Sequence, residues 1–337
     1  MKAELYPAEP SAKRGRGRPR KNLQEADIPS MDSRQADKDI LNACRRKERS
    51  MARYDEMREC LIEAVRQMKP LPKASFSGKA RASDNEGVML ISDMHLGADC
   101  NNFYNRYDSS IAYARLMHYV GMTVEYCHEN NVKRLNVLNL GDLIQGIIHT
   151  NARIESTMDV ADEVIKASEM MAAALTELQK AAPEVIYRSC LDNHSRVTAD
   201  LDESVEGESF VRIIDWYLKE RLKDTSIVFK DDNPDNGLGK FTLMNGKTMM
   251  FAHGHQDSIN QAFQHFVGAT RQFVDYIALG HYHCPKIKDY QGAKVIVNGS
   301  IVGTENYALS KRLFTSPSQT LLIFRGKDLL SYIVDLD

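Results

Sequence analysis

The 337-residue sequence has no long hydrophobic run, no paired cysteines and almost no net charge. No apolar stretch approaches the roughly 18–20 residues of a transmembrane helix, and the N-terminus lacks the apolar core of a signal peptide. We therefore expect a protein of the bacterial cytoplasm with no membrane partner. The cysteines form no CxxC pair, which excludes a zinc finger and favours reduced thiols; they are Cys44, Cys60, Cys100, Cys127, Cys190 and Cys284.

The net charge of −2 conceals two regions of opposite sign. Residues 1–80 contain 19 Lys and Arg against 12 Asp and Glu, a charge of +7. The remaining residues contain 25 against 34, a charge of −9. A basic front on an acidic body indicates an arm that binds a polyanion and a body that can bind cations.

The basic front is predicted to contain three parts. Residues 1–35 lack apolar periodicity and are expected to be a disordered arm. Residues 36–69 contain no glycine, and apolar residues recur there at helical spacing, which predicts a helix that packs on the main domain or on a second copy of the chain. Residues 70–87 resemble a linker.

From residue 88 to residue 337, short apolar runs alternate with amphipathic segments. Strands are expected at 88–91, 135–140, 184–188, 247–252, 276–279, 294–297 and 320–324, and helices at 110–130, 155–181 and 206–222. This alternation predicts one α/β domain.

Polar residues that can bind metals follow several of these strands. In chain order they are Asp93 and His95, Asp142, Asn193 and His194, His253 and His255, and His281 and His283. Functional groups gather at the carboxyl ends of strands in open α/β sheets, so these residues are expected to meet. Mixed imidazole and carboxylate ligands suit divalent transition ions, and a carboxylate can bridge two of them.

The order D-x-H, G-D, N-H, H, G-H-x-H resembles the calcineurin-like metallophosphoesterases, which include the SbcD-type repair nucleases and proteins of tailed phages. The resemblance covers residues 88–303 and implies a four-layer α-β-β-α sandwich with two mixed β-sheets. It also implies hydrolysis of phosphoesters by a metal-activated hydroxide. Two divalent ions are implied, with Mn²⁺ the first expectation and Zn, Fe, Ni or Mg as alternatives.

The resemblance also implies roles for individual residues. The first ion would be bound by Asp93, His95, Asp142 and His283, and the second by Asn193, His253 and His281, with Asp142 bridging. His194 corresponds to the catalytic histidine, and His255 is expected in the outer shell or facing the substrate.

Two positions depart from the family pattern, in which Gly-Asn-His is followed by an acid. Asp192 stands in place of the glycine, and aspartate tolerates the positive φ that glycine permits better than most residues do. Ser195 stands in place of the acid, which removes an expected orienting partner of His194. A non-catalytic member of the family is therefore an alternative.

The arm provides the evidence about the substrate. Arg16, Gly17, Arg18, Pro19 and Arg20 resemble the core of an AT-hook, which places arginines in the narrow minor groove of A·T-rich DNA. We therefore expect DNA as partner and a DNA nuclease, exonuclease-like in kind, with a phage as one source of the gene. The alternatives are a phosphodiesterase or phosphatase for a small nucleotide or a phosphoprotein, and a non-catalytic DNA-binding protein.

Overall fold

The computed structural model describes residues 33–69, 71–78, 83–205, 207–231 and 237–337. The arginines of the AT-hook-like segment lie outside these residues. The chain divides into two units, residues 1–49 and residues 50–337. No helix in the described ranges is long and apolar enough to cross a membrane.

Helix α1 (Ser33–Gln67) covers the segment that the periodicity predicts as helical. Its first half is the described part of the first unit. In its second half Met57 and Leu61 are buried in the core of the main unit, and Tyr54 and Val65 pack against the same core. The spacing of these four residues follows one helix face, so this half of α1 packs on the main domain.

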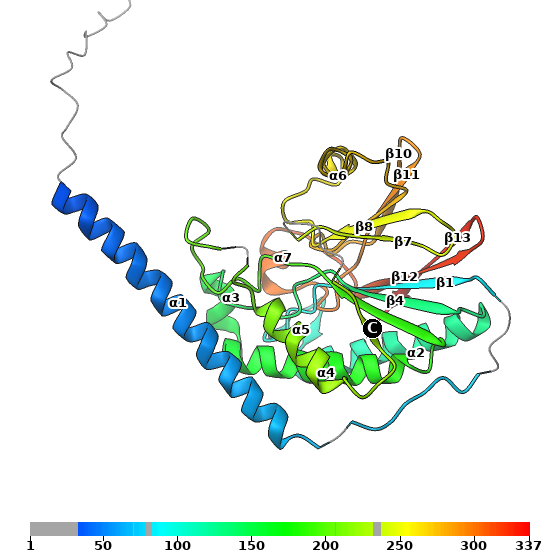
Figure 1. The fold of residues 1–337 in the computed structure, drawn as a ribbon, viewed down its shortest axis with the longest axis horizontal. Helices are drawn as coiled ribbons and strands as arrows, with labels where there is room; N and C mark the ends of the chain where they lie inside the picture. The colour runs from blue at the N-terminus through cyan, green and yellow to red at the C-terminus, as the bar shows by residue number, and fades with distance from the viewer. Residues whose placement is uncertain (1–32, 70, 79–82, 206, 232–236) are drawn as a thin grey trace, which may run out of the picture. The chain divides into compact units, whose positions relative to one another are not determined.

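The main unit contains two mixed β-sheets and a small hairpin (Figure 1). The six-stranded sheet has the order β13-β12-β1-β4-β5-β6, in which β1, β4, β5 and β6 run parallel. Its strands are β1 (Glu86–Ile91), β4 (Arg134–Asn139), β5 (Glu184–Ser189), β6 (Val228–Phe229), β12 (Ser318–Arg325) and β13 (Asp328–Asp335). Strand β12 is antiparallel to both β1 and β13.

The five-stranded sheet has the order β10-β11-β9-β8-β7, with a parallel centre and antiparallel edges. Its strands are β7 (Gly239–Thr242), β8 (Thr248–Ala252), β9 (Tyr276–Leu279), β10 (Lys286–Tyr290) and β11 (Ala293–Val297). The hairpin pairs β2 (Cys100–Asn101) with β3 (Arg106–Tyr107).

The two sheets pack face to face through an apolar layer that includes Leu90, Leu138, Phe251 and Ala278. Helices cover the outer faces (Figure 1). The six-stranded sheet is covered by α2 (Ser109–Glu129), α4 (Val160–Leu178) and α5 (Phe210–Arg221), and the five-stranded sheet by α6 (Ala262–Thr270). The short helices are α3 (Thr150–Glu155) and α7 (Asn306–Ser310). The expected four-layer α-β-β-α sandwich is confirmed.

The strands expected from apolar runs are all present within one or two residues of their predicted ends. The expected helix at 155–181 is present as α4 but begins only at Val160, because Asp159 caps its N-terminus by accepting the N–H of Asp162. Helix α3, which precedes it, was not expected. The short or exposed strands β2, β3, β6, β7, β10 and β13 were not expected, since they lack a buried apolar run.

Candidate metal centre

The candidate ligands lie at the carboxyl ends of five parallel strands, where the two sheets meet. Strand β1 leads to Asp93 and His95, β4 to Asp142, and β5 to Asn193 and His194. Strand β8 of the other sheet leads to His253, and β9 leads to His281 and His283. The structure thus brings together six of the seven residues expected as ligands, together with His194, and the seventh, Asn193, directly precedes His194 in the chain.

These side chains form three overlapping groups. Asp93, His95 and His283 form one, His95, Asp142 and His194 the second, and Asp142, His253 and His281 the third; in each, the ligand atoms lie within 4.8 Å of one another. His283 Nε2 lies 3.3 Å from Asp93 Oδ1. His253 Nε2 lies 3.0 Å from Asp142 Oδ2. Asp142 belongs to two of the groups, and its Oδ2 also lies 3.8 Å from His95 Nε2, so it lies between the imidazoles of the two sheets.

The backbone at the site is strained. Asp93, His95, Asp142, His281 and His283 all have φ between 46° and 68°, the left-handed region that side chains other than glycine rarely adopt. Such conformations cost of order 1–3 kcal/mol each and persist only where the surrounding structure imposes them. Five of the seven candidate ligands adopt this conformation, which turns their side chains out of the strands toward one point.

Glycine at position 141 allows the turn before Asp142 to fit closely. Gly141 has a φ of 96°, and a Cβ on it would lie 2.5 Å from Asp192 Cβ and 3.0 Å from His253 Nδ1. Any larger residue would therefore push apart loops from the two sheets. The Gly-Asp pair in the sequence has this steric origin.

Three histidines are fixed in the tautomer that a metal ligand requires. Nδ1 of His95 lies 3.0 Å from Gln145 Oε1, Nδ1 of His253 lies 2.7 Å from Leu140 O, and Nδ1 of His194 lies 2.7 Å from Gln145 O. These oxygens accept hydrogen bonds only, so each Nδ1 carries the proton. When the ring is neutral, Nε2 is then the nitrogen with the free lone pair, as in metal sites where an outer partner orients the ring.

One buried atom at the site lacks a partner among the described residues. Asn193 Oδ1 is enclosed and accepts no hydrogen bond, whereas His253 Nε2, also enclosed, lies 3.0 Å from Asp142 Oδ2. An unsatisfied buried polar atom costs about 1–3 kcal/mol, which a metal ligand bond would remove. Asn193 is expected to bind the second ion, so its unsatisfied oxygen fits a divalent cation.

The electrostatics also favour a cation. Burial lowers the pKa of His253, but the negative charges of Asp142 and Asp93 outweigh it and raise the pKa to about 10. Burial raises the pKa of Asp142, yet the facing imidazoles of His253 and His194 hold it well below its usual range. A field that holds a proton on a buried imidazole at neutral pH also stabilises a divalent cation.

The two departures from the family pattern have structural explanations. Asp192 is not among the residues with positive φ, so this position does not require the conformation that glycine permits. Its side chain instead accepts hydrogen bonds from the N–H of Asp142 at 2.9 Å and from the N–H of Ser195 at 2.6 Å. The carbonyl oxygen of Gln145 orients His194, so no acid is needed at position 195 for this purpose.

Three further residues at the site carried no recognisable signal in the sequence. Gln145 orients two histidines, one through its side chain and one through its carbonyl group. The ring of His149 lies 5.4 Å from that of His194, and Arg196 Nε donates to the carbonyl oxygen of Asn193 at 3.1 Å. None of them follows a strand directly, so only the tertiary fold places them.

His255 lies at the edge of the site. Its side chain is exposed, and its ring is 5.5 Å from His253 and 6.4 Å from His281. It belongs to none of the three groups of potential ligands. Its position faces solvent next to the centre.

The chain matches no known family model. It is 25% identical over 316 residues to the SPbeta prophage-derived uncharacterized protein YonJ of Bacillus subtilis (strain 168), which covers 90% of this chain and 77% of that protein. Among solved structures it is similar to an archaeal phosphodiesterase, with 12% identity, a TM-score of 0.37, and coverage of 74% of this chain and 99% of that one. It is also similar to a zinc complex of Vps29 from Entamoeba histolytica, with 14% identity, a TM-score of 0.34, and coverage of 74% of this chain and 99% of that one.

Proposed function

We propose that this chain is a dinuclear metal-dependent phosphoesterase of the calcineurin-like type that cleaves phosphodiester bonds of DNA. The observation that carries the proposal is the sharing of Asp142 between groups of imidazole and carboxylate atoms at the junction of the two sheets. A carboxylate shared in this way is what a two-metal hydrolase uses to hold both ions at one phosphate.

In this proposal Asp93, His95 and His283 bind the first ion, Asn193, His253 and His281 bind the second, and Asp142 binds both. The two ions, Mn²⁺ by first expectation, would supply Lewis-acid charge and lower the pKa of a bound water. The exchangeable alternatives are Zn, Fe, Ni and Mg, which imidazole and carboxylate ligands also accept.

His194 is proposed as the group that moves the proton. Its Nδ1 donates to Gln145 O, and its main-chain N–H donates to Asp142 Oδ1 at 3.2 Å. One bond therefore holds the ring and the other holds the backbone, and Nε2 lies 3.9 Å from Asp142 Oδ2. From this position a protonated Nε2 can donate to the leaving oxygen as the phosphodiester bond breaks.

The choice of DNA as substrate rests on the basic arm and on the relative in a prophage. Residues 16–20 of the arm would anchor the enzyme on A·T-rich DNA, raising the local concentration of substrate for the metal centre. The similarity to a prophage-derived protein agrees with a phage origin.

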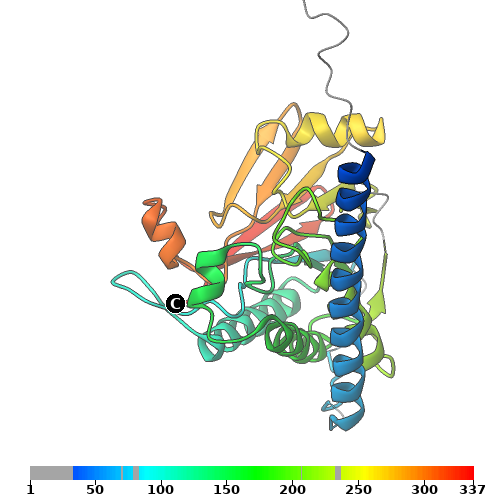
Figure 2. The same ribbon diagram turned by 90° about the vertical axis from the view of Figure 1, so that its left-hand side faces the viewer.

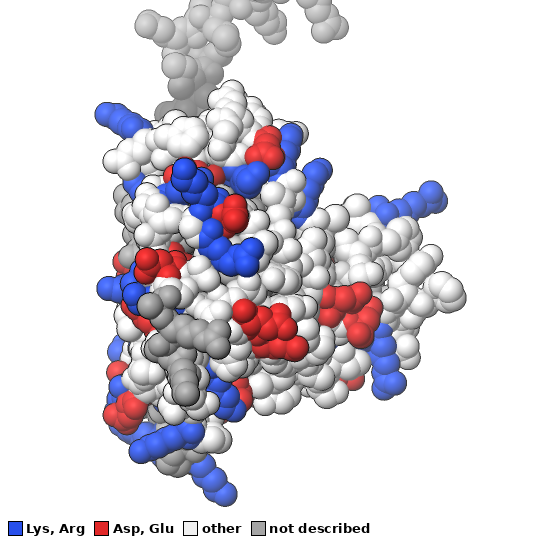
Figure 3. Space-filling model, turned by 90° about the vertical axis from the view of Figure 1, so that its right-hand side faces the viewer, with Lys and Arg blue, Asp and Glu red and all other residues white. Residues whose placement is uncertain are grey.

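A small nucleotide diester is the second candidate substrate. Over the described surface that Figure 3 displays, basic and acidic side chains are interspersed, and no continuous basic stripe crosses this face. The body of the chain is also acidic. These charges favour a small substrate over duplex DNA, because the binding of a duplex relies on the neutralisation of its phosphates.

An activity panel with Mn²⁺ tests the proposal. Single-stranded DNA, duplex DNA, RNA, cyclic nucleotides and bis-p-nitrophenyl phosphate are incubated with the full chain and with the Asp142→Asn variant. We expect hydrolysis of DNA and of the chromogenic diester by the full chain only. Turnover of cyclic nucleotides without cleavage of DNA would instead select the second candidate, and inactivity on every substrate would refute both.

A further inference from the structure

A group of exposed aromatic rings lies on the hairpin β2–β3 and on the segment after α7. The exposed fractions are 94% for Phe103, 54% for Tyr104 and 52% for Phe314. The ring centroids of Phe103 and Tyr104 are 5.1 Å apart, and those of Tyr104 and Phe314 are 4.7 Å apart. We call these three residues the aromatic platform. Exposed apolar side chains that contact one another mark interaction sites on protein surfaces.

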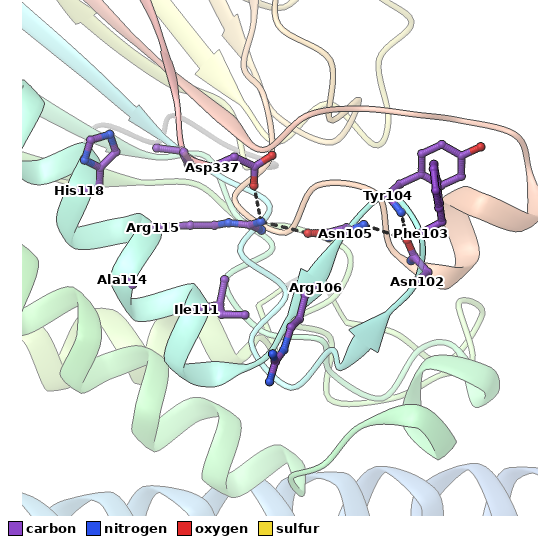
Figure 4. A pocket seen from close by; sticks show the side chains of 11 residues that line it. Asn102, Phe103, Tyr104, Asn105, Arg106, Ile111, Ala114, Arg115, His118 and Asp337 are labelled. Carbon is purple, nitrogen blue, oxygen red and sulfur yellow. Dashed lines mark hydrogen bonds and ion pairs between the residues drawn. The ribbon is translucent and has the colours of Figure 1, made fainter.

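The hairpin that carries the platform is held in place by hydrogen bonds. Asn102 Oδ1 accepts the N–H groups of Tyr104 and Asn105 at 2.9 and 3.0 Å. Asn105 Nδ2 donates to Val302 O at 2.6 Å, and Arg115 Nη2 donates to Asn105 Oδ1 at 3.0 Å. Figure 4 shows the contact between Arg115 and Asn105 and the contacts at Asn102. A binding surface fixed in this way loses little conformational entropy when a ligand binds.

The hairpin that carries the platform is connected to the candidate metal centre through the backbone. Strand β2 begins five residues after His95. The N–H of Val302, whose carbonyl oxygen binds Asn105, donates to the carbonyl oxygen of Asp93 at 3.2 Å. Two consecutive hydrogen bonds thus connect the hairpin to a proposed metal ligand, and Figure 2 shows the hairpin projecting beside α7.

The surroundings of the rings suit a charged, planar ligand. A cavity of about 650 Å³ opens beside Phe103 and Tyr104, and the exposed Arg106 lines it. Arg115 and Asp337 also line it, but they form an ion pair at 2.7 Å, so Arg115 is not available to a ligand. Arg312, two residues before Phe314, is exposed like Arg106. Aromatic faces next to guanidinium groups are the surface that proteins offer to unpaired bases and the phosphates between them.

We propose that the aromatic platform stacks unpaired nucleobases of single-stranded DNA next to the phosphodiester held at the metal centre. A duplex hides the faces of its bases, so the occupant is a single strand. The inference rests on the proposed nuclease function and specifies its substrate as a strand with unpaired bases near the scissile bond.

The test measures binding separately from hydrolysis, so that each proposal can fail alone. Fluorescence anisotropy gives the Kd of a labelled dT12 strand, of the same strand with abasic sites, and of a 12-base-pair duplex, all with the full chain. Stacking is worth about 1–3 kcal/mol per base, so a double variant Phe103→Ala/Tyr104→Ala is expected to weaken dT12 binding at least about fivefold. The arm contributes to all three ligands, whereas the platform contributes to dT12 alone.

Matched variants separate stacking from other effects. Tyr104→Phe is expected to keep the dT12 affinity because it keeps the ring. Phe273→Ala removes another exposed ring, 55% exposed, and is expected to leave all three Kd values unchanged. A 2-aminopurine base in the strand is expected to lose fluorescence on binding to the full chain and to lose less on binding to the double variant.

The outcomes that overturn the inference are specific. Equal Kd values for dT12 and for the abasic strand show that the bases are not recognised. An unchanged Kd in the double variant, with a loss of self-association in gel filtration, shows that the platform binds a second copy of the chain. If the full chain binds dT12 through the platform but cleaves no phosphodiester, the platform stands and the proposed nuclease activity fails.

Discussion

The two sheets contribute different chemistry to the same centre. The six-stranded sheet supplies the carboxylates Asp93 and Asp142, together with His95, Asn193 and His194. The five-stranded sheet supplies only imidazoles, from His253, His281 and His283. The negative charge that attracts cations therefore belongs to one half of the domain, and the other half completes the coordination with ligands that are neutral when bound to a metal.

This difference shows that the site depends on the packing between sheets. The apolar layer that includes Leu90 and Phe251 holds the two halves together, and His253 Nε2 reaches across to within 3.0 Å of Asp142. Neither sheet alone contains a complete set of ligands. Substitutions in the two halves should consequently have unequal effects, and the following predictions measure that inequality.

The largest effect is expected from Asp142→Asn. The change keeps the size of the side chain but removes the charge shared by two ligand groups. Because a bound metal contributes several kcal/mol to the transition state, turnover of bis-p-nitrophenyl phosphate should fall about a thousandfold. Elemental analysis after Mn²⁺ loading and dialysis should give fewer than two equivalents per chain.

Two further variants sharpen the comparison between the sheets. His281→Gln, in the five-stranded sheet, leaves Asp93, His95 and His283 intact, so it should retain about one equivalent of Mn²⁺. Asp224→Asn, at an exposed aspartate, should behave as the unchanged chain does. Full activity and two equivalents in Asp142→Asn would contradict a shared carboxylate.

The next largest effect is expected from His194→Gln, which removes a proposed proton donor but none of the proposed metal ligands. Positioned acid–base groups contribute at least about a hundredfold, so kcat should fall by that factor while the Mn²⁺ content stays the same. The loss should be greater for a dinucleotide than for the p-nitrophenyl diester, because p-nitrophenolate leaves without a proton.

Steady-state kinetics on the two diesters provides the measurement, and His265→Gln, at an exposed histidine on α6, serves as the control. Equal losses on both substrates would argue against proton donation by His194. A fall in bound Mn²⁺ would assign His194 to the coordination of the metal instead.

A smaller effect is expected from Gln145→Leu. The variant removes the oxygen that accepts the proton of His95 Nδ1 but keeps the carbonyl group that orients His194. Partners of this kind change metal affinity by about 10–100-fold, so the Mn²⁺ concentration for half-maximal activity should rise about tenfold. Gln145→Glu keeps an acceptor and should remain near the original value; equal metal dependence of all three chains would exclude the role.

The sequence was sufficient to predict the sandwich and the group of ligands, because both follow from local patterns. Buried parallel strands such as β1 and β4 appear as short apolar runs, and the ligands follow them directly. Gln145 could not be predicted, since it lies beyond the Gly-Asp turn and acquires its role only when β1 and β4 bring Leu96 next to Ile144. The contacts of Asp192 depend in the same way on tertiary structure. The family pattern, which has glycine at this position, gave no indication of them.

The smallest effect on activity, and a distinct effect on stability, is expected from Asp215→Asn on α5. Asp142 faces imidazoles, which hold its pKa down, whereas Asp215 accepts hydrogen bonds from the hydroxyl groups of Tyr187 and Ser189. Burial raises the pKa of Asp215 to about 6. The native state therefore binds its proton more tightly than the unfolded chain does, and ionisation of Asp215 destabilises the fold as the pH rises from about 4 to 6.

Replacement by asparagine removes this penalty at high pH and has no such effect where Asp215 is protonated. The change in the free energy of unfolding on Asp215→Asn should therefore be more favourable at pH 8 than at pH 4 by about 2 kcal/mol, since the group is partly exposed and the full shift is not realised. Urea unfolding of both chains at the two pH values measures the difference, with Asp224→Asn as control. A difference of the opposite sign would mean that Asp215 is stabilised as a carboxylate, as Asp142 is, and that the contrast between the two residues does not exist.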